Sequence, residues 1–245
     1  MTSKKLLLIL AAAGILAAGC KGGLKTETYT DEEEIPTLEG RADTLSVSIS
    51  LEYPVKGAEE DILGAMTRNI LSAAFGLEDS PVGTVEQTVT RYVEDLKDDF
   101  FTIEASEPEF WEDRVNGYFS GEWKDYRSYM VEYYTFQGGP HGEGTMAPLV
   151  LDLNSGEVVE EADFFADGYE QPVGALIRKR LPEALDGDEQ LLADIYDLES
   201  VAPNGNFEVT SAGVTWYFNP YDIAPYYMGV IRVTVPWNEL TDYLR

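Results

Sequence analysis

The chain of 245 residues carries 45 acidic and 17 basic side chains, a formal net charge of −28, with one cysteine and one histidine. These counts exclude an internal disulfide framework, a cysteine or multi-histidine metal site, and a second imidazole for acid–base chemistry. Because nucleic-acid binding depends on Lys and Arg side chains that neutralise phosphates, the negative charge also argues against a nucleic-acid partner. With 44% hydrophobic residues, the chain can bury a substantial core in one large or two small domains.

Residues 1–19 have the pattern of a signal peptide. Two lysines precede an uncharged run from Leu6 to Leu16, which is too short to span a bilayer but fits the hydrophobic part of such a peptide. Small residues and then Cys20 follow, and this ending resembles the lipobox of bacterial lipoproteins, in which cleavage leaves a lipid-modified cysteine as the first residue. That pattern prefers Leu where this sequence has Ala17. The alternative is an ordinary secretory signal followed by an unrelated cysteine.

From this resemblance we predict that acyl chains such as palmitate are attached at Cys20. The lipid would hold the protein on a bacterial membrane outside the cytoplasm, facing the periplasm or the cell surface. Cleavage would leave 15 basic and 45 acidic side chains, a net charge of −30. Residues 20–42 show little hydrophobic periodicity and contain the acidic run 31–34, so we expect an acidic flexible tether there.

The next segment, residues 43–136, begins with a strand pattern and continues with helical patterns. Apolar side chains occupy every second position from Leu45 to Tyr53, which predicts a half-buried strand. Two amphipathic helices are expected from Ile62 to Ala74 and from Val85 to Phe100. Thr84 and Gln87 have the spacing of a capping box before the second helix.

An aromatic band then runs from Trp111 to Phe136. Its high β-propensity predicts two strands joined near Gly121. The rings either pack a sheet against its helices or form a platform on which sugar rings stack.

The last segment, residues 137–245, opens with a glycine-rich loop. A strand around residues 149–153, a helix over 173–181, alternating residues over 207–218 and a final strand over 231–235 follow. Strands and helices come in separate runs, which predicts the α+β class. We expect largely antiparallel sheets with helices packed on one face, in two intimately associated subdomains.

Two stretches of the sequence resemble the DUF3298 domain family. The first runs from Tyr133 to Gly156 and includes the loop sequence GGPHG, in which the family has alanine at the place of Pro140. The second runs from Phe218 to Leu240 and includes the sequence FNPYDIAPY. The strand and helix after residue 44 are similar to the partner domain DUF4163. The chain is thus identified as a lipoprotein with a DUF4163-like domain over 43–136 and a DUF3298-like domain over 137–245.

This resemblance implies a location and a class of role. Such domain pairs occur outside the cytoplasmic membrane as lipoproteins, as accessory regions of peptidoglycan deacetylases, and as the outer part of anti-sigma factors that sense lysozyme. We therefore expect a non-enzymatic, lipid-anchored binding or sensor module of the cell envelope. Its ligand would be a cationic protein such as lysozyme, attracted by the acidic surface, or cell-wall glycan (peptidoglycan). The alternative is a carboxylate-based hydrolase that acts on cell-wall glycan.

The ligand-binding candidates lie in the two DUF3298-like stretches. His141 stands in the glycine-rich loop with Gly139 and Pro140, and its role is structural, ligand-contacting or catalytic. Tyr221, Asp222 and Tyr226 lie in a loop that two prolines stiffen. The chain has no Gly-x-Ser-x-Gly motif, and with 45 acids a pair of carboxylates identifies nothing. We predict no catalytic residue, no cofactor and no metal.

Overall fold

The computed structural model describes residues 23–36, 44–77, 83–101 and 110–245. The predicted signal peptide and Cys20 lie outside these residues. The fold is α+β, as predicted, with one sheet of five strands and one of three. The first sheet contains β1 (Lys25–Pro36), β2 (Thr44–Lys56), β3 (Phe110–Trp123), β4 (Tyr126–Gln137) and β5 (Glu143–Asp152), in that order. All its neighbouring pairs are antiparallel except β2 and β3.

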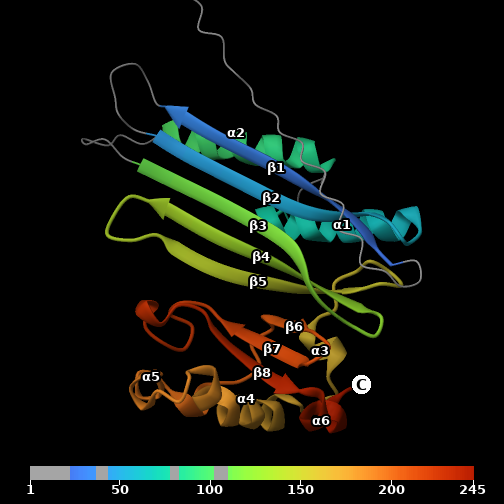
Figure 1. The fold of residues 1–245 in the computed structure, drawn as a ribbon, viewed down its shortest axis with the longest axis vertical. Coiled ribbons are helices and arrows are strands. Elements are labelled where there is room, and N and C mark those ends of the chain that lie inside the picture. The colour runs from blue at the N-terminus through green and yellow to red at the C-terminus, as the bar shows by residue number, and fades with distance from the viewer. Residues whose placement is uncertain (1–22, 37–43, 78–82, 102–109) are drawn as a thin grey trace, which may run out of the picture.

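Helices α1 (Glu60–Phe75) and α2 (Val85–Phe101) connect β2 to β3 and cover one face of the first sheet (Figure 1). Both helices were predicted. The Thr84 hydroxyl accepts from the Gln87 backbone N–H, and the Gln87 side chain accepts from the Thr84 N–H, which confirms the capping box. Gly76 ends α1 in the left-handed conformation, at φ 62°. The inward residues of β2, among them Ile49 and Leu51, form a core with both helices.

The second sheet lies beyond the β5 edge of the first (Figure 1). It contains β6 (Phe207–Val209), β7 (Gly213–Phe218) and β8 (Ile231–Pro236), all antiparallel. Helices α3 (Glu161–Phe164), α4 (Glu170–Ala184), α5 (Glu189–Ala193) and α6 (Trp237–Leu240) accompany it, with short 3-10 turns at Leu198–Ser200, Tyr226–Met228 and Thr241–Tyr243. Side chains of α4 such as Ile177 and Leu181 share a second core with Trp216 of β7.

The two sheets are joined by buried contacts. The Ser128 hydroxyl of β4 donates to the Val209 carbonyl oxygen and accepts from the Val209 N–H, both at 2.8 Å. At the end of the β3–β4 hairpin, Trp123 stacks on Trp237 with ring centroids 3.8 Å apart. The two subdomains are therefore intimately associated, as expected.

The predicted tether is wrong for residues 25–36, because they form β1 and pair with β2 over their whole length. Tyr29 and Ile35 pack against the first core, so apolar contacts stabilise this segment although it contains several acidic residues. Glu33 forms an ion pair with Lys97 of α2 at 2.7 Å. Alternation in a strand also sends successive acids to opposite faces, which reduces their mutual repulsion.

Two other boundaries differ from the predictions. The turn between β3 and β4 is formed at residues 124–125, where Lys124 has φ 53°, and Gly121 lies inside β3 at a register shift. A Cβ at Gly121 would lie 2.6 Å from the Val209 oxygen, so this glycine permits close approach of β6 instead of a turn. The predicted division after residue 136 separates β4 from β5, which are paired, so the first sheet extends to Asp152.

The aromatic band divides between the two faces of the sheet. Tyr129 and Tyr133 belong to the first core. Tyr134 lies on the opposite face, beneath the Arg114 guanidinium. Core packing is thus confirmed for the rings on one face, and the rings on the other face are left outside this core because strand residues alternate.

Candidate functional site

The structure brings the two predicted candidate loops into contact. The loop of residues 138–142 comes from the first sheet, and the segment of residues 219–229 connects β7 to β8 in the second. The rings of His141 and Tyr226 stack with centroids 4.0 Å apart. The Tyr226 hydroxyl donates to the Gly142 carbonyl oxygen at 2.5 Å, and His141 Nδ1 lies 3.1 Å from the same oxygen. Candidates more than 80 residues apart in sequence therefore form one surface.

Glycines give the first loop its shape. Gly138 and Gly139 have φ values of 83° and 96°, which side chains with a Cβ rarely adopt. A Cβ on Gly142 would lie 2.4 Å from the Tyr134 hydroxyl oxygen. Pro140 and His141 are exposed at the tip of the loop. The glycine-rich motif is thus explained by backbone conformation and close packing.

Hydrogen bonds fix the second segment. The Asn219 side chain accepts from the Met146 N–H at 2.8 Å and donates to the Met146 carbonyl oxygen at 3.1 Å, which attaches the segment to β5. Asp222 accepts from the Asn219 N–H at 2.7 Å, so its carboxylate closes a turn. Tyr221 has φ 72° and is 54% exposed, with its ring centroid 5.9 Å from that of Tyr226.

Two further exposed tyrosines adjoin these candidates and were missed. Tyr196 is 59% exposed, and its N–H donates to the Ile223 carbonyl oxygen. Tyr227 is 63% exposed, and its hydroxyl donates to Asp194, a bond that raises the pKa of this tyrosine. Only the tertiary fold shows that residue 196 lies beside the 219–229 segment. We call His141, Tyr196, Tyr221, Tyr226 and Tyr227 the tyrosine surface.

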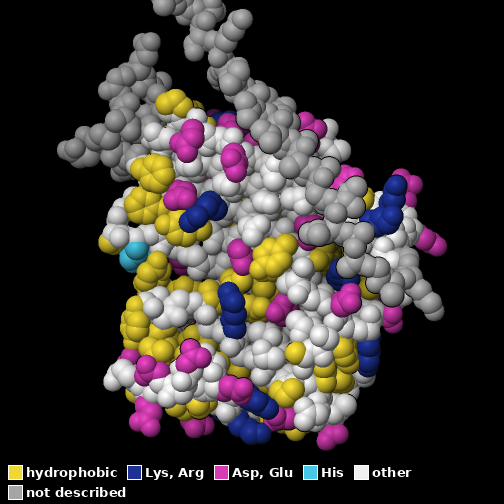
Figure 2. All heavy atoms as spheres, in the orientation of Figure 1, with side chains coloured by type: hydrophobic (Ala, Val, Ile, Leu, Met, Phe, Trp, Pro, Cys, Tyr) yellow, Lys and Arg dark blue, Asp and Glu magenta, His cyan; other side chains and the backbone are white. Residues whose placement is uncertain are grey.

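Acidic side chains border the tyrosine surface. Asp222 and Glu143 are exposed next to the two candidate loops. Asp197 and Glu199 are exposed directly after Tyr196. Figure 2 shows the histidine side chain at one edge of the molecule, with hydrophobic side chains above and below it along that edge. The arrangement is an aromatic centre with a negative border.

A groove of about 650 Å³ adjoins the tyrosine surface. One wall is the outer face of β3, β4 and β5, with Arg114, Asn116 and Glu132. The other wall is the segment after β7, with Tyr226 and Tyr227. The groove therefore lies where the first sheet meets a loop of the second.

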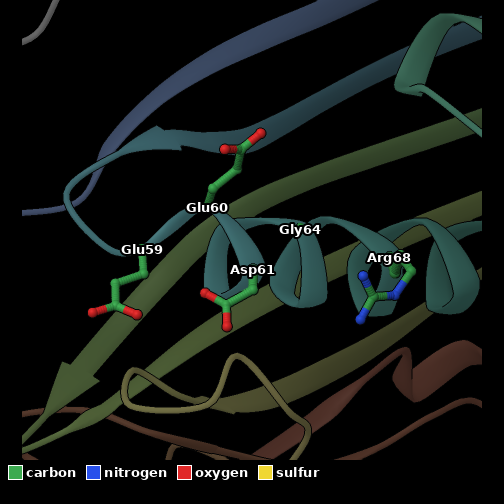
Figure 3. Close-up of a pocket in the computed structure, with 5 residues that line it drawn as sticks. All are labelled: Glu59, Glu60, Asp61, Gly64 and Arg68. Atoms are coloured by element: carbon green, nitrogen blue, oxygen red, sulfur yellow. The ribbon is translucent and has the colours of Figure 1, made fainter.

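A second hollow of about 680 Å³ lies at the start of α1, lined by Glu59, Glu60, Asp61, Gly64 and Arg68. Figure 3 shows Glu60 pointing away from Glu59 and Asp61, so the three carboxylates do not converge. Acids at this place complement the positive end of the helix dipole, and Asp61 accepts from the Ile62 N–H. The favourable interaction with the helix dipole is sufficient to explain this cluster.

The most buried carboxylates have internal partners. Glu161 accepts from the Gly205 N–H at 2.8 Å and from the Trp216 indole, and Asp113 accepts from the Tyr92 hydroxyl at 3.0 Å. Burial raises the pKa of both carboxyls, and it also raises the pKa of Tyr92. Glu208 accepts from Ser120 and Tyr217 where the two sheets meet. These bonds connect elements of the fold.

The described residues contain no group of three or more His, Cys, Asp or Glu side chains placed to hold a metal ion. Among them, no helix is both long and apolar enough to cross a membrane. In this part of the chain, the ring contact of His141 is with Tyr226, and its hydrogen-bonding partner is the Gly142 carbonyl oxygen.

Two solved protein structures have a similar fold. A DUF3298-family protein from Bacteroides fragilis has a similar structure, with a TM-score of 0.78, 22% identity, and coverage of 91% of this chain and 94% of that one. A DUF3298-family protein from Pseudomonas aeruginosa has a TM-score of 0.67 and 17% identity, with coverage of 91% and 95%. No curated protein matches the chain. Residues 162–238 match the family described as "Protein of unknown function (DUF3298)", and this match confirms the resemblance to that family noted in the second stretch, up to residue 238.

Proposed function

We propose that the protein is a non-enzymatic binding module of the cell envelope, and that its tyrosine surface binds a cationic protein such as lysozyme. The observation that carries this proposal is the exposure of Tyr196, Tyr221 and Tyr227, at 54% to 63%, inside a border of carboxylates. Exposed tyrosines form the energetic centre of many protein interfaces, and a charged rim guides the partner.

The overall charge supports the same partner. An excess of 28 negative charges attracts cationic proteins at long range and repels phosphate backbones. In the proposed complex, Lys or Arg side chains of the partner lie over tyrosine rings and pair with the neighbouring acids. The extracytoplasmic location is part of this proposal, with lipid attached at Cys20. The proposal also includes a DUF4163-like character of the N-terminal subdomain.

Substitutions on the tyrosine surface test this function. Tyr196→Ala and Tyr221→Ala should each weaken lysozyme binding by about 1–2 kcal/mol, because each removes a large ring from the interface centre. Binding would be measured by titration calorimetry with the full chain in detergent. Phe101→Ala is the matched control, since Phe101 is a 47% exposed ring on α2. Equal affinities for all three variants and the wild type would exclude this surface.

Lipid attachment has a separate test. Cells that express the full chain should incorporate labelled palmitate into the protein, and Cys20→Ser should abolish incorporation because the chain has no other cysteine. The same experiment measures whether the protein stays with the membrane fraction. Labelling that persists in Cys20→Ser would contradict the assignment.

A further inference from the structure

We propose that the groove between the first sheet and the 219–229 segment binds a neutral saccharide. This site is separate from the centre of the tyrosine surface, although Tyr226 and Tyr227 contribute to both. Its volume of about 650 Å³ lies in the range of small-molecule sites, which is roughly 300–1,000 Å³.

The sheet wall of the groove carries a fixed row of polar groups. Glu132 Oε2 accepts from the Asn116 amide at 3.2 Å, and Glu132 Oε1 accepts from the Tyr118 hydroxyl at 2.8 Å. Among the described residues, the Asn116 side-chain carbonyl oxygen has no hydrogen-bond partner. Asn116 therefore presents an acceptor whose direction its neighbour already fixes. Such preorganisation reduces the entropy lost when a ligand binds.

Arg114 supplies donors beside this row. Its Nε atom is paired with Glu112 at 3.0 Å, and its guanidinium lies 4.3 Å from the Tyr134 ring centroid. The side chain nevertheless remains 53% exposed. The ion pair and the ring hold the plane of the guanidinium. An arginine held in this way can donate two parallel bonds to neighbouring oxygens.

The charge of the lining selects against charged ligands. Among the described residues that line the groove, Arg114 is the one cation and Glu132 the one carboxylate, so this lining is balanced within a chain of net charge −28. A polyanion would meet Glu132 and the acidic body, and a polycation would meet Arg114. A neutral ligand with many hydroxyl groups avoids both penalties and uses both kinds of partner.

The wall formed by the segment after β7 suits the apolar face of a sugar ring. This wall is mainly apolar and lies opposite the polar row. It is formed by Tyr226, Tyr227, Pro220 and Val230. A pyranose ring has an apolar face of C–H groups and an edge of hydroxyl groups. The sugar would therefore lie with its C–H face on the loop wall and its hydroxyls toward Asn116 and Arg114.

Titration calorimetry of the full chain in a sugar-free detergent tests this site. The probes are tri- to hexasaccharides of N-acetylglucosamine and of glucose, which are neutral, and of galacturonic acid, which is anionic. We expect at least one neutral series to bind, and the anionic series to bind about tenfold more weakly or not at all. The two neutral series show which sugar the groove prefers.

Substitutions locate the binding. Asn116→Ala should weaken the neutral oligosaccharide about tenfold, and adding Arg114→Met should weaken it further. Ser48→Ala is the control, because Ser48 is the β2 neighbour of Arg114 and does not line the groove. Each variant is first checked for an unchanged thermal midpoint, and a groove variant that fails is replaced by Thr145→Ala, because Thr145 also lines the groove. Absence of neutral-sugar binding, or equal affinities for the groove variants and the control, would overturn the proposal. Tyr196→Ala should bind sugar normally, which separates this result from the protein-binding test.

Discussion

Ser128 connects the two sheets through a single hydroxyl. It is fully buried, and it both donates to and accepts from the backbone of Val209. Ser128→Ala would leave a buried N–H and a buried carbonyl oxygen without partners. Each costs about 1–3 kcal/mol, so we predict a loss of about 2–6 kcal/mol in the free energy of unfolding.

Urea unfolding followed by tryptophan fluorescence measures this loss. Ser50→Ala on the open face of β2 is the control and should change stability by less than about 0.5 kcal/mol. A loss at Ser128 no larger than that of the control would mean that this hydroxyl does not join the sheets.

The candidate residues show what local sequence can predict about a site. His141, Tyr221 and Tyr226 were found because glycine and proline motifs marked their loops, and the fold brings the three together. Asp222 lies in the same loop, where its carboxylate caps a turn. Tyr196 follows a short helix without any motif, so only the fold places it beside Ile223.

The first strand, β1, was not predicted from the sequence. Four consecutive acids suggested repulsion and a solvated chain, yet β1 pairs with β2 from Lys25 to Pro36. Helices α1 and α2 and the inward face of β2 were predictable because hydrophobic periodicity marks them directly. Strand pairing depends on a partner elsewhere in the chain, which local periodicity does not reveal.

Hydrogen exchange distinguishes a strand from a tether. We predict that alternate amides of residues 25–36 are protected, because every second N–H of an edge strand bonds to its neighbour. NMR of the labelled full chain measures this residue by residue. Uniform exchange at the rate of an unstructured peptide would contradict the pairing with β2.

Acid pH should stabilise the whole molecule. Burial raises the pKa of Asp113 and of Glu161, so between pH 7 and about pH 4 the folded state binds more protons than the unfolded state. The free energy of unfolding therefore rises as pH falls through this window. Relief of repulsion within a chain of net charge −28 acts in the same direction.

Urea unfolding at several pH values measures the trend. Asp113→Asn keeps an acceptor for the Tyr92 hydroxyl but cannot titrate, so its stability should depend less on pH than that of the wild type. Wild-type stability that falls steadily from pH 7 to pH 5 would contradict the predicted sign.

We propose that the acidic body binds a cationic protein through its tyrosine surface. The most direct test of this proposal is the affinity of the full chain for lysozyme, measured from low salt to about 0.5 M NaCl. We predict binding at low salt that weakens as salt rises, because the Debye length falls from about 30 Å at 0.01 M to less than 10 Å. Absence of binding at low salt, or an affinity that salt does not change, would contradict it.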